Sequence, residues 1–330
     1  MSREVPQEIA IGKNGQLFLI GGNHSVLEYI SGEKQILEGA KRIFRNNIRA
    51  RAEYCTQRGM NYAHFVCPDK HTILFDDFPF EIKVNVSKIF DDFCEGDVVL
   101  PTAELRKVQE LEGAYMRTDT HWSALGQLEV VRQVINRLDW QIPTAKKKLD
   151  AIRNALIIQK DYIGDLGNKL NPKDKEDRLI YPLPSHIFKF NNGVTGNNGT
   201  ITAYINPEAT GKLMVFGDSF IISCMDMISS FFGESIVVRT PFFHREMVDQ
   251  FKPDAVLTAN VERYLPNMPL DDDAPIATLF AQILDREFRP DPYHFEVLSA
   301  LLRPDSNHKE RTLKRVFAAL EEKKTAAAMA

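Results

Sequence analysis

The sequence contains no apolar run that approaches the roughly 20 residues of a membrane-spanning helix. Its longest apolar stretches, such as residues 17–20, have the length of core segments. The opening residues, MSREVPQEIAIG, also lack the basic start, the apolar run and the small-residue cleavage site of a signal peptide. From these absences we expect a cytoplasmic protein with no membrane span.

Cysteine is scarce, and an excess of positive charge is missing. The cysteines, Cys55, Cys67, Cys94 and Cys224, are widely spaced and include no CxxC pair. Zinc sites and disulfide frameworks usually show tighter spacing, so we expect reduced, mostly buried thiols and neither a metal nor another cofactor. The formal net charge is −4 at pH 7, which argues against a nucleic-acid-binding protein with a basic face.

What the sequence does contain is an alternation of short apolar segments and helical patterns. We predict strands at residues 17–20, 62–67, 97–100, 213–216, 235–238 and 255–257, and helices at about 33–58, 123–138 and 221–232. Strands that alternate with helices predict an α/β fold with a mostly parallel sheet and helices on both faces. We expect one domain over residues 1–330, with a charged, solvated insert at about 145–200 and a C-terminal helix at about 306–323.

Ser219 is the first candidate for chemistry. It follows the predicted strand 213–216 in the run Gly217-Asp218-Ser219. Ligands in open α/β sheets bind beyond the carboxyl ends of strands, so a serine at this turn is exposed to substrate. Its own N–H can face a developing oxyanion. The alternative is a structural serine that caps the following helix.

Asp119 and His121 form the second candidate, in the run TDTHWS at 118–123. A serine hydroxyl needs a base to remove its proton, and an imidazole base needs a carboxylate to hold its tautomer. Residues two apart in an extended segment point to the same side, so Asp119 can reach one ring nitrogen while the other faces outward. A surface loop with an incidental histidine is the alternative, as is metal ligation, for which no further His or Cys cluster is evident.

Taken together, the two blocks predict a Ser-His-Asp enzyme of the esterase type. Residues 217–220, GDSF, are similar to the nucleophile block of the SGNH (GDSL-like) hydrolases, and residues 119–123, DTHWS, resemble the corresponding block of the alginate O-acetylation proteins of the AlgJ/AlgX type. The segments 12–19, 66–70 and 164–167 look like that same family, in the same order. As in that group, and unlike ordinary SGNH enzymes, the Asp-His block precedes the serine block.

This resemblance, over roughly residues 11–265, implies an SGNH fold with a permuted order of catalytic blocks. It implies transfer or removal of acetyl groups on a polysaccharide hydroxyl. By position it assigns Ser219 as nucleophile, His121 as base and Asp119 as the residue that orients the base. Members of the family are typically exported proteins.

Further residues are candidates for the oxyanion hole or for substrate contact. Asn260, Arg239 and Arg245 follow predicted strands, and Tyr264 lies a little further on. The alternative role is a turn cap for Asn260, a surface charge for Arg245 and core packing for Tyr264. Trp122, with Phe242 and Phe243, could form a sugar-stacking surface or part of the core.

Three functions remain open from the sequence. The first is a serine-dependent O-acetyltransferase that acts on a glycan hydroxyl through an acyl-enzyme. The second is a carbohydrate O-acetyl esterase, which uses the same residues with water as acceptor. The third is a non-catalytic glycan-binding or scaffold module. The expected partner is a glycan or an acetylated carbohydrate, and the acetyl donor is left open.

Overall fold

The computed structural model describes residues 4–95, 98–140, 144–303 and 306–329, and it is built around a six-stranded sheet. The strand order is β3 (Asn61–Cys67), β10 (Ala255–Val261), β8 (Lys212–Gly217), β9 (Glu234–Arg239), β7 (Ile201–Ile205) and β6 (Phe188–Asn191). The first four strands are parallel to one another; β7 pairs antiparallel with β9, and the edge strand β6 pairs antiparallel with β7. The predicted mostly parallel α/β fold is confirmed.

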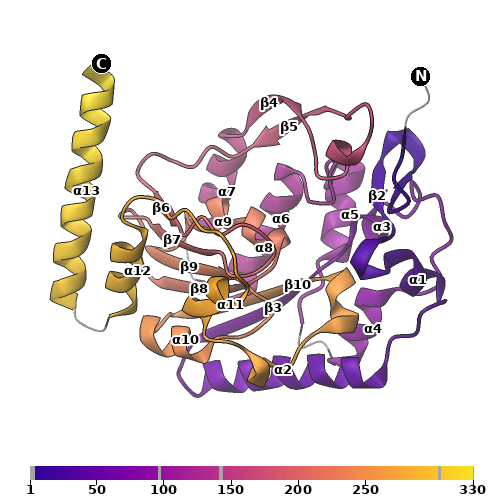
Figure 1. Ribbon diagram of the computed structural model, residues 1–330, viewed down its shortest axis with the longest axis horizontal. Helices are drawn as coiled ribbons and strands as arrows, with labels where there is room; N and C mark the ends of the chain where they lie inside the picture. Colours follow the sequence, from indigo (N-terminus) through magenta and orange to yellow (C-terminus); the bar gives the residue numbers. More distant parts are fainter. Residues whose placement is uncertain (1–3, 96–97, 141–143, 304–305, 330) are drawn as a thin grey trace.

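Side chains of the central strands point alternately to two apolar cores, as the period of two in a strand requires. In β8, Leu213 and Val215 pack into one core, and Met214 and Phe216 pack into the other. Helices cover both faces (Figure 1). Those on the first face include α4 (Val86–Phe93), α6 (Ala124–Arg137), α8 (Ser219–Ser223) and α9 (Met225–Ile228); those on the second are α10 (Arg245–Phe251), α12 (His294–Leu302) and α13 (Ser306–Met329).

The remaining elements lie around this sheet. α2 (Glu38–Thr56) contributes Phe44 and Ile48 to the first core and Cys55 to the second. Smaller elements are β1 (Ile9–Ile11) and β2 (Leu17–Leu19), which pair antiparallel, and the helices α1 (Val26–Ser31), α3 (Lys70–Ile73), α5 (Thr102–Leu111), α7 (Ala145–Asn154) and α11 (Phe280–Ile283). Searched over the described residues, no helix has the length and apolar character needed to span a membrane.

The chain connections place the end of β8 at a crevice. From β8 the chain passes through α8 and α9, on the first face, to the neighbouring strand β9. From β9 it passes through α10, on the second face, to β10 on the other side of β8. Because the connections leave on opposite faces of the sheet, the carboxyl end of β8 is the position at which open α/β sheets bind ligands.

Several predicted elements differ from the observed ones. The strand predicted at 255–257 continues to Val261, because the polar Thr258 and Asn260 are paired in the sheet like their apolar neighbours. The single helix predicted at 221–232 is wrong, since α8 ends at Ser223 and α9 begins at Met225. The Ser223 hydroxyl donates to the carbonyl of Phe220 at 2.6 Å, a local bond that competes with helix continuation.

The insert is also more structured than predicted. Its charged segment contains two strands, β4 (Ile157–Tyr162) and β5 (Glu176–Ile180), which form an antiparallel pair. Of the strand predicted at 97–100, Asp97 lies outside the described residues and Val99 forms an isolated parallel bridge with Phe65. All four cysteines are buried thiols outside any disulfide, as predicted.

Candidate active site

Ser219 begins α8 directly after the end of β8. Asp218 occupies the N-cap, and its carboxylate accepts from the Phe220 N–H at 3.0 Å and from the Val261 N–H at 2.6 Å. Burial raises the pKa of Asp218, although these two N–H donors partly oppose the effect. Since Asp218 supplies the cap, the alternative role of Ser219 as the capping side chain is wrong, and its hydroxyl is left for another partner.

Gly217 allows the turn to pass this closely over the sheet. A Cβ atom at this position would lie 2.5 Å from Cγ2 of Ile221 and 2.9 Å from the carbonyl oxygen of Ala259. Any side chain here would therefore displace either the helix or β10. The glycine in the Gly-Asp-Ser run is thus required by packing.

His121 lies in the loop that leads into α6. On its C-terminal side, Trp122 is fully buried, and its ring N–H donates to the Tyr115 hydroxyl at 2.8 Å. Ser123 caps α6 by accepting from the Gly126 N–H at 3.2 Å, as predicted. The loop is therefore anchored immediately beside His121, which limits the freedom of the imidazole.

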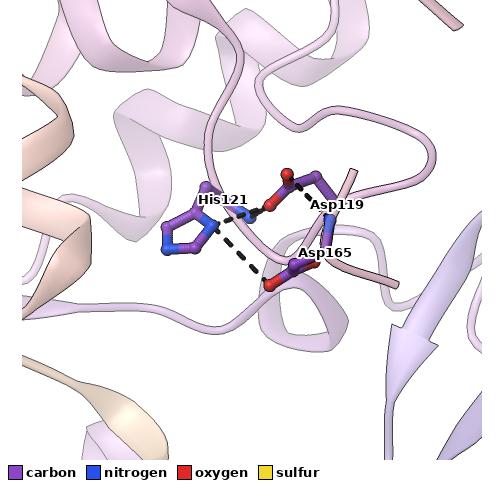
Figure 2. A group of neighbouring side chains, drawn as sticks. All are labelled: Asp119, His121 and Asp165. Carbon is purple, nitrogen blue, oxygen red and sulfur yellow. Dashed lines mark hydrogen bonds and ion pairs between the residues drawn. The ribbon is translucent and has the colours of Figure 1, made fainter. Parts of the chain in front are cut away.

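The two candidate blocks meet in space through the His121 ring. Nε2 lies 2.8 Å from the Ser219 hydroxyl oxygen, and Nδ1 lies 2.7 Å from Oδ1 of Asp119. Figure 2 shows the Nδ1 edge of the ring turned to Asp119, and the opposite nitrogen, Nε2, is the one that contacts the serine. Residues 98 positions apart thus form one hydrogen-bonded chain from hydroxyl to imidazole to carboxylate.

Asp119 is held in its ionised form. Burial alone would raise its pKa, but hydrogen bonds from His121 and from the Tyr162 hydroxyl outweigh burial and hold the pKa well below its usual value. The backbone N–H groups of His121, at 2.9 Å, and Asp165, at 3.2 Å, complete its set of donors. A carboxylate with this many donors can orient an imidazole without accepting its proton.

The insert fastens the Asp-His loop from one side. Glu176 of β5 accepts from the backbone N–H of Arg117 at 2.8 Å and from the N–H and hydroxyl of Thr118 at 2.6 and 2.5 Å. Gly164 and Gly167 approach the same loop so closely that their Cβ atoms would lie 2.2 Å from the Thr118 carbonyl oxygen and 2.9 Å from the Thr118 Cβ. The insert predicted to be solvated is therefore part of the site's framework.

Lys70, in the segment 66–70, connects this segment and the segment 12–19 to the Asp-His loop. Its buried ammonium group donates to the carbonyl oxygens of Leu17 at 2.9 Å, Met116 at 2.6 Å and Arg117 at 2.9 Å. Burial lowers the pKa of Lys70 to about 7, with Glu176 and Asp119 opposing the effect. The segments 12–19, 66–70 and 164–167 thus converge on the residues around Asp119.

Ser219 and His121 open into a cleft of about 450 Å³, which adjoins a second pocket of about 580 Å³. Asp165 also lines the first cavity. Asn260 and Phe242 line the second. Six residues line both cavities: Asn23, His24, Asn197, Arg239, Arg263 and Tyr264.

Not all of the sequence-predicted residues reach this cleft. Arg239 and Tyr264 line both cavities, and Asn260 lines the second. Arg245 lines neither cavity and lies instead over the ring of Tyr54, because it points outward from the first turn of α10.

The aromatic surface predicted for sugar stacking is only partly present. Trp122 is 0% exposed and packs edge-on against Phe220, so it belongs to the core and cannot contact a substrate. Phe243 is likewise buried. Phe242 does line the second pocket, and Tyr264 lines it as well.

Several residues of the site were missed from the sequence, among them Tyr162, Asp165 and Arg263. Asp165 falls within the segment 164–167 that carried the resemblance, so a signal for it was present. Arg263 bonds to the buried Asp69 and lines both cavities. Tyr162 gave no local signal, because its contact with Asp119 spans 43 positions.

Asp119, His121 and Asp165 could also be considered as metal ligands, since their donor atoms lie within 4.8 Å of one another. Their hydrogen bonds favour a different role. Nδ1 of His121 faces Asp119, both Asp119 oxygens accept N–H or O–H donors, and both Asp165 oxygens accept from Thr120. With these atoms already paired within the protein, the cluster fits orientation of the imidazole better than ligation of an ion.

A mostly parallel α/β sheet with a serine after a central strand, and with an Asp-His loop at the same edge, defines the SGNH hydrolase-like class of fold. Solved structures share it. The chain is similar to PatB1 from Bacillus cereus at 12% identity, covering 78% of this chain and 96% of that one, with a TM-score of 0.56. It is similar to the O-acetyltransferase domain of AlgJ from Pseudomonas putida at 16% identity, covering 81% and 95%, with a TM-score of 0.50.

A DHHW family protein from Eubacterium siraeum is also similar, at 11% identity over 81% of this chain and 95% of that one, with a TM-score of 0.57. No family model and no curated protein matches the sequence. These comparisons confirm, at the level of the fold, the resemblance stated from the motifs.

Proposed function

We propose that this chain is a serine-dependent O-acetyltransferase that acts on a glycan hydroxyl through an acyl-enzyme on Ser219. The observation that carries the proposal is the hydrogen-bonded chain from Ser219 through His121 to Asp119, with distances of 2.8 and 2.7 Å. These distances lie within the range expected for a nucleophile, its base and the group that orients the base.

In the first half-reaction, His121 Nε2 takes the proton of the Ser219 hydroxyl as its oxygen attacks the acetyl carbonyl carbon. The N–H of Ser219 is a donor for the oxyanion of the tetrahedral intermediate. The intermediate collapses when the bond from carbon to the leaving oxygen breaks, and His121 returns the proton to that oxygen. The acetyl group is then an ester on Ser219, and the deacetylated donor departs.

In the second half-reaction, a sugar hydroxyl gives its proton to His121 and attacks the Ser219 ester. Collapse of the second intermediate releases the acetylated sugar, and the proton returns to the serine oxygen. Asp119 remains ionised throughout and stabilises the imidazolium formed in each step. With water in place of the sugar, the same steps make the chain an esterase.

The cleft supports a carbohydrate ligand. Sugars bind through hydrogen bonds to their hydroxyl groups and through apolar contact of the ring with aromatic side chains. Amide side chains of Asn23, Asn197 and Asn260 line the two cavities, and Phe242 and Tyr264 supply aromatic surface. Two adjoining cavities also provide separate space for a donor and an acceptor.

The similar structures agree with this choice of chemistry. The AlgJ domain is described as an O-acetyltransferase, and one structure of PatB1 carries a sulfonyl adduct. A sulfonyl fluoride is therefore a suitable reagent for this chain, in which we expect it to modify Ser219.

The first experiment is hydrolysis of p-nitrophenyl acetate by the wild type and by Ser219→Ala. We expect measurable release of p-nitrophenol by the wild type and its loss in the variant, with unchanged circular dichroism. Ser223→Ala is the matched control, because Ser223 is in the same short helix and its hydroxyl donates to the carbonyl of Phe220 and not to His121. Equal activity of Ser219→Ala and wild type would reject the nucleophile assignment.

The second experiment separates transferase from esterase. Acetyl-enzyme is formed with p-nitrophenyl acetate in the presence of oligosaccharide acceptors, and the products are analysed by mass spectrometry. A gain of one acetyl group on an oligosaccharide supports the proposal, whereas release of acetate alone supports the esterase. Absence of any ester chemistry in the wild type would favour the non-catalytic glycan-binding module.

A further inference from the structure

Asp165 places a second carboxylate at the His121 ring nitrogen that Asp119 already contacts (Figure 2). Its Oδ2 lies 3.8 Å from Nδ1, compared with 2.7 Å for Oδ1 of Asp119. Thr120 holds it there by donating its N–H to Oδ1 at 2.8 Å and its hydroxyl to Oδ2 at 2.5 Å. Since Thr120 is the residue between Asp119 and His121, the second carboxylate is fixed relative to both.

The two carboxylates act on the ring in different ways. A separation of 3.8 Å is too long for a hydrogen bond, so Asp165 influences His121 through its charge. Asp119 is buried, while the Asp165 side chain is 43% exposed and lines the cleft, where solvent partly screens its charge. At this separation, even a screened attraction to a positive ring is comparable to the energy of a hydrogen bond.

We propose that Asp165 is a positioning residue that stabilises the imidazolium of His121 as a second negative charge beside Asp119. The inference rests on the proposed function, in which the His121 ring becomes positive only after it takes the Ser219 proton. An interaction that strengthens as this charge develops stabilises the transition state more than the ground state, and so raises the rate.

Among the described residues, Asp119 and Asp165 are the carboxylates within ion-pair distance of the His121 ring. Desolvation and the neighbouring Asp119 charge raise the pKa of Asp165, which is the expected consequence of two carboxylates that share one site. Asp218 also interacts with His121 through its charge, while its carboxylate oxygens accept from the Phe220 and Val261 N–H groups, and the Tyr162 hydroxyl donates to Asp119. The charged or titratable groups that line the rest of the cleft are Glu8, His24, Lys169, Arg239, Arg263 and Tyr264.

The test is the substitution Asp165→Asn, which preserves the size of the side chain and an oxygen for Thr120. The pH profile of p-nitrophenyl acetate hydrolysis is measured for wild type and variant. Because a negative charge favours the protonated ring, its loss should move the midpoint of the acid limb to lower pH by about half to one unit. The plateau rate should fall by about 3- to 10-fold.

Asp161→Asn is the control, because Asp161 is exposed at the end of β4 and pairs with Lys175 instead of His121. We expect its profile to match that of the wild type. In Asp119→Asn, Asp165 is the carboxylate that remains beside the ring and carries the stabilisation. The activity of the double variant Asp119→Asn/Asp165→Asn should therefore fall well below that of Asp119→Asn.

Two outcomes would overturn the inference. One is a uniform loss of rate with an unmoved acid limb, which indicates a structural role only; the other is a rise in KM alone, which indicates substrate contact. NMR titration of the His121 ring in both proteins is independent of turnover, and equal titration midpoints would also reject the pairing. Failure of the proposed function is distinct, because Ser219→Ala would then keep its activity whatever Asp165→Asn does.

Discussion

The Tyr162 hydroxyl donates to the Asp119 oxygen that faces away from His121. The bond links the end of β4, in the insert, to the loop that carries the proposed base. Burial and the Asp119 charge both raise the pKa of Tyr162, so the phenol stays protonated and remains a donor. The charged insert thereby takes part in setting the electrostatics of the site.

Removal of this hydroxyl in Tyr162→Phe should weaken both fold and activity. A hydrogen bond to a charged group contributes about 1.5–3 kcal/mol, and Tyr162 is half-buried, so we expect the free energy of unfolding to fall by about 1–2 kcal/mol. The rate of ester hydrolysis should fall by about 10-fold, as measured beside urea denaturation. Tyr181→Phe, which loses a bond to the neutral Ser230 hydroxyl, should lose less than half as much of either quantity.

Acid should destabilise the wild type through Asp119. The pKa of this carboxyl is lowered in the folded protein. The stability that Asp119 contributes is therefore fully present above the pKa of an unfolded aspartate, about 4, and is lost progressively as pH falls from there toward the lowered folded pKa. In Asp119→Asn this contribution is missing at every pH. The difference in unfolding free energy between the two proteins should therefore narrow from pH 6 to pH 3. A constant difference over that range would show that Asp119 is not preferentially ionised in the fold.

Lys70→Met should destabilise the protein strongly. The substitution preserves length but removes the ammonium donor of the buried Leu17 and Met116 carbonyl groups, and it leaves the Arg117 carbonyl with the Leu17 N–H as its donor. We expect a loss of roughly 3–5 kcal/mol in unfolding free energy, measured by denaturant titration. Lys160→Met, at a side chain that is 70% exposed, should change it by less than about 0.5 kcal/mol. Similar values for the two variants would mean that the Lys70 contacts contribute little.

Gly164→Ala tests the close approach of the insert to the Asp-His loop. The added Cβ would meet the Thr118 carbonyl oxygen at 2.2 Å, and this backbone cannot move without shifting Asp119. We expect a lower melting temperature and at least a 10-fold lower esterase rate. Gly39→Ala, in the first turn of α2 with no atom within 4 Å, should instead stabilise by about 0.5–1 kcal/mol.

Phe242→Ala separates recognition of the acceptor from the chemical step. Phe242 lines the second pocket and does not line the cavity at Ser219. We expect the KM for an oligosaccharide acceptor to rise by about 10-fold, while p-nitrophenyl acetate hydrolysis stays within about twofold of the wild type. Phe80→Ala, at a ring that is 43% exposed and packs on Phe78, should alter neither value. An equal loss in both assays would place Phe242 in the framework of the nucleophile instead.

The fold was predictable where a local pattern decides it. The apolar runs 62–67, 213–216 and 235–238 all form strands of the sheet, because a strand buried on both faces reads as a continuous apolar segment. The apolar pattern ended the last strand too early, because the polar Thr258 and Asn260 are also paired in the sheet. It also predicted one continuous helix where the Ser223 hydroxyl bonds to a backbone carbonyl and the helix ends. In the insert, charge suggested solvent exposure, but the charges of Glu176 and Asp165 face the Asp-His loop.

The sequence by itself determined which residue types stand at the site. It placed a serine at a glycine turn after a strand, and an Asp and a His two apart before a capped helix, because strand ends, turns and caps depend on neighbours in the chain. Only the tertiary structure decided what those residues contact. The bonds from Tyr162 to Asp119 and from Lys70 to backbone carbonyl groups, the burial of Trp122 and the outward position of Arg245 depend on segments far apart in sequence. No local pattern encodes such contacts, since they exist only once the sheet, the insert and the loops have packed together.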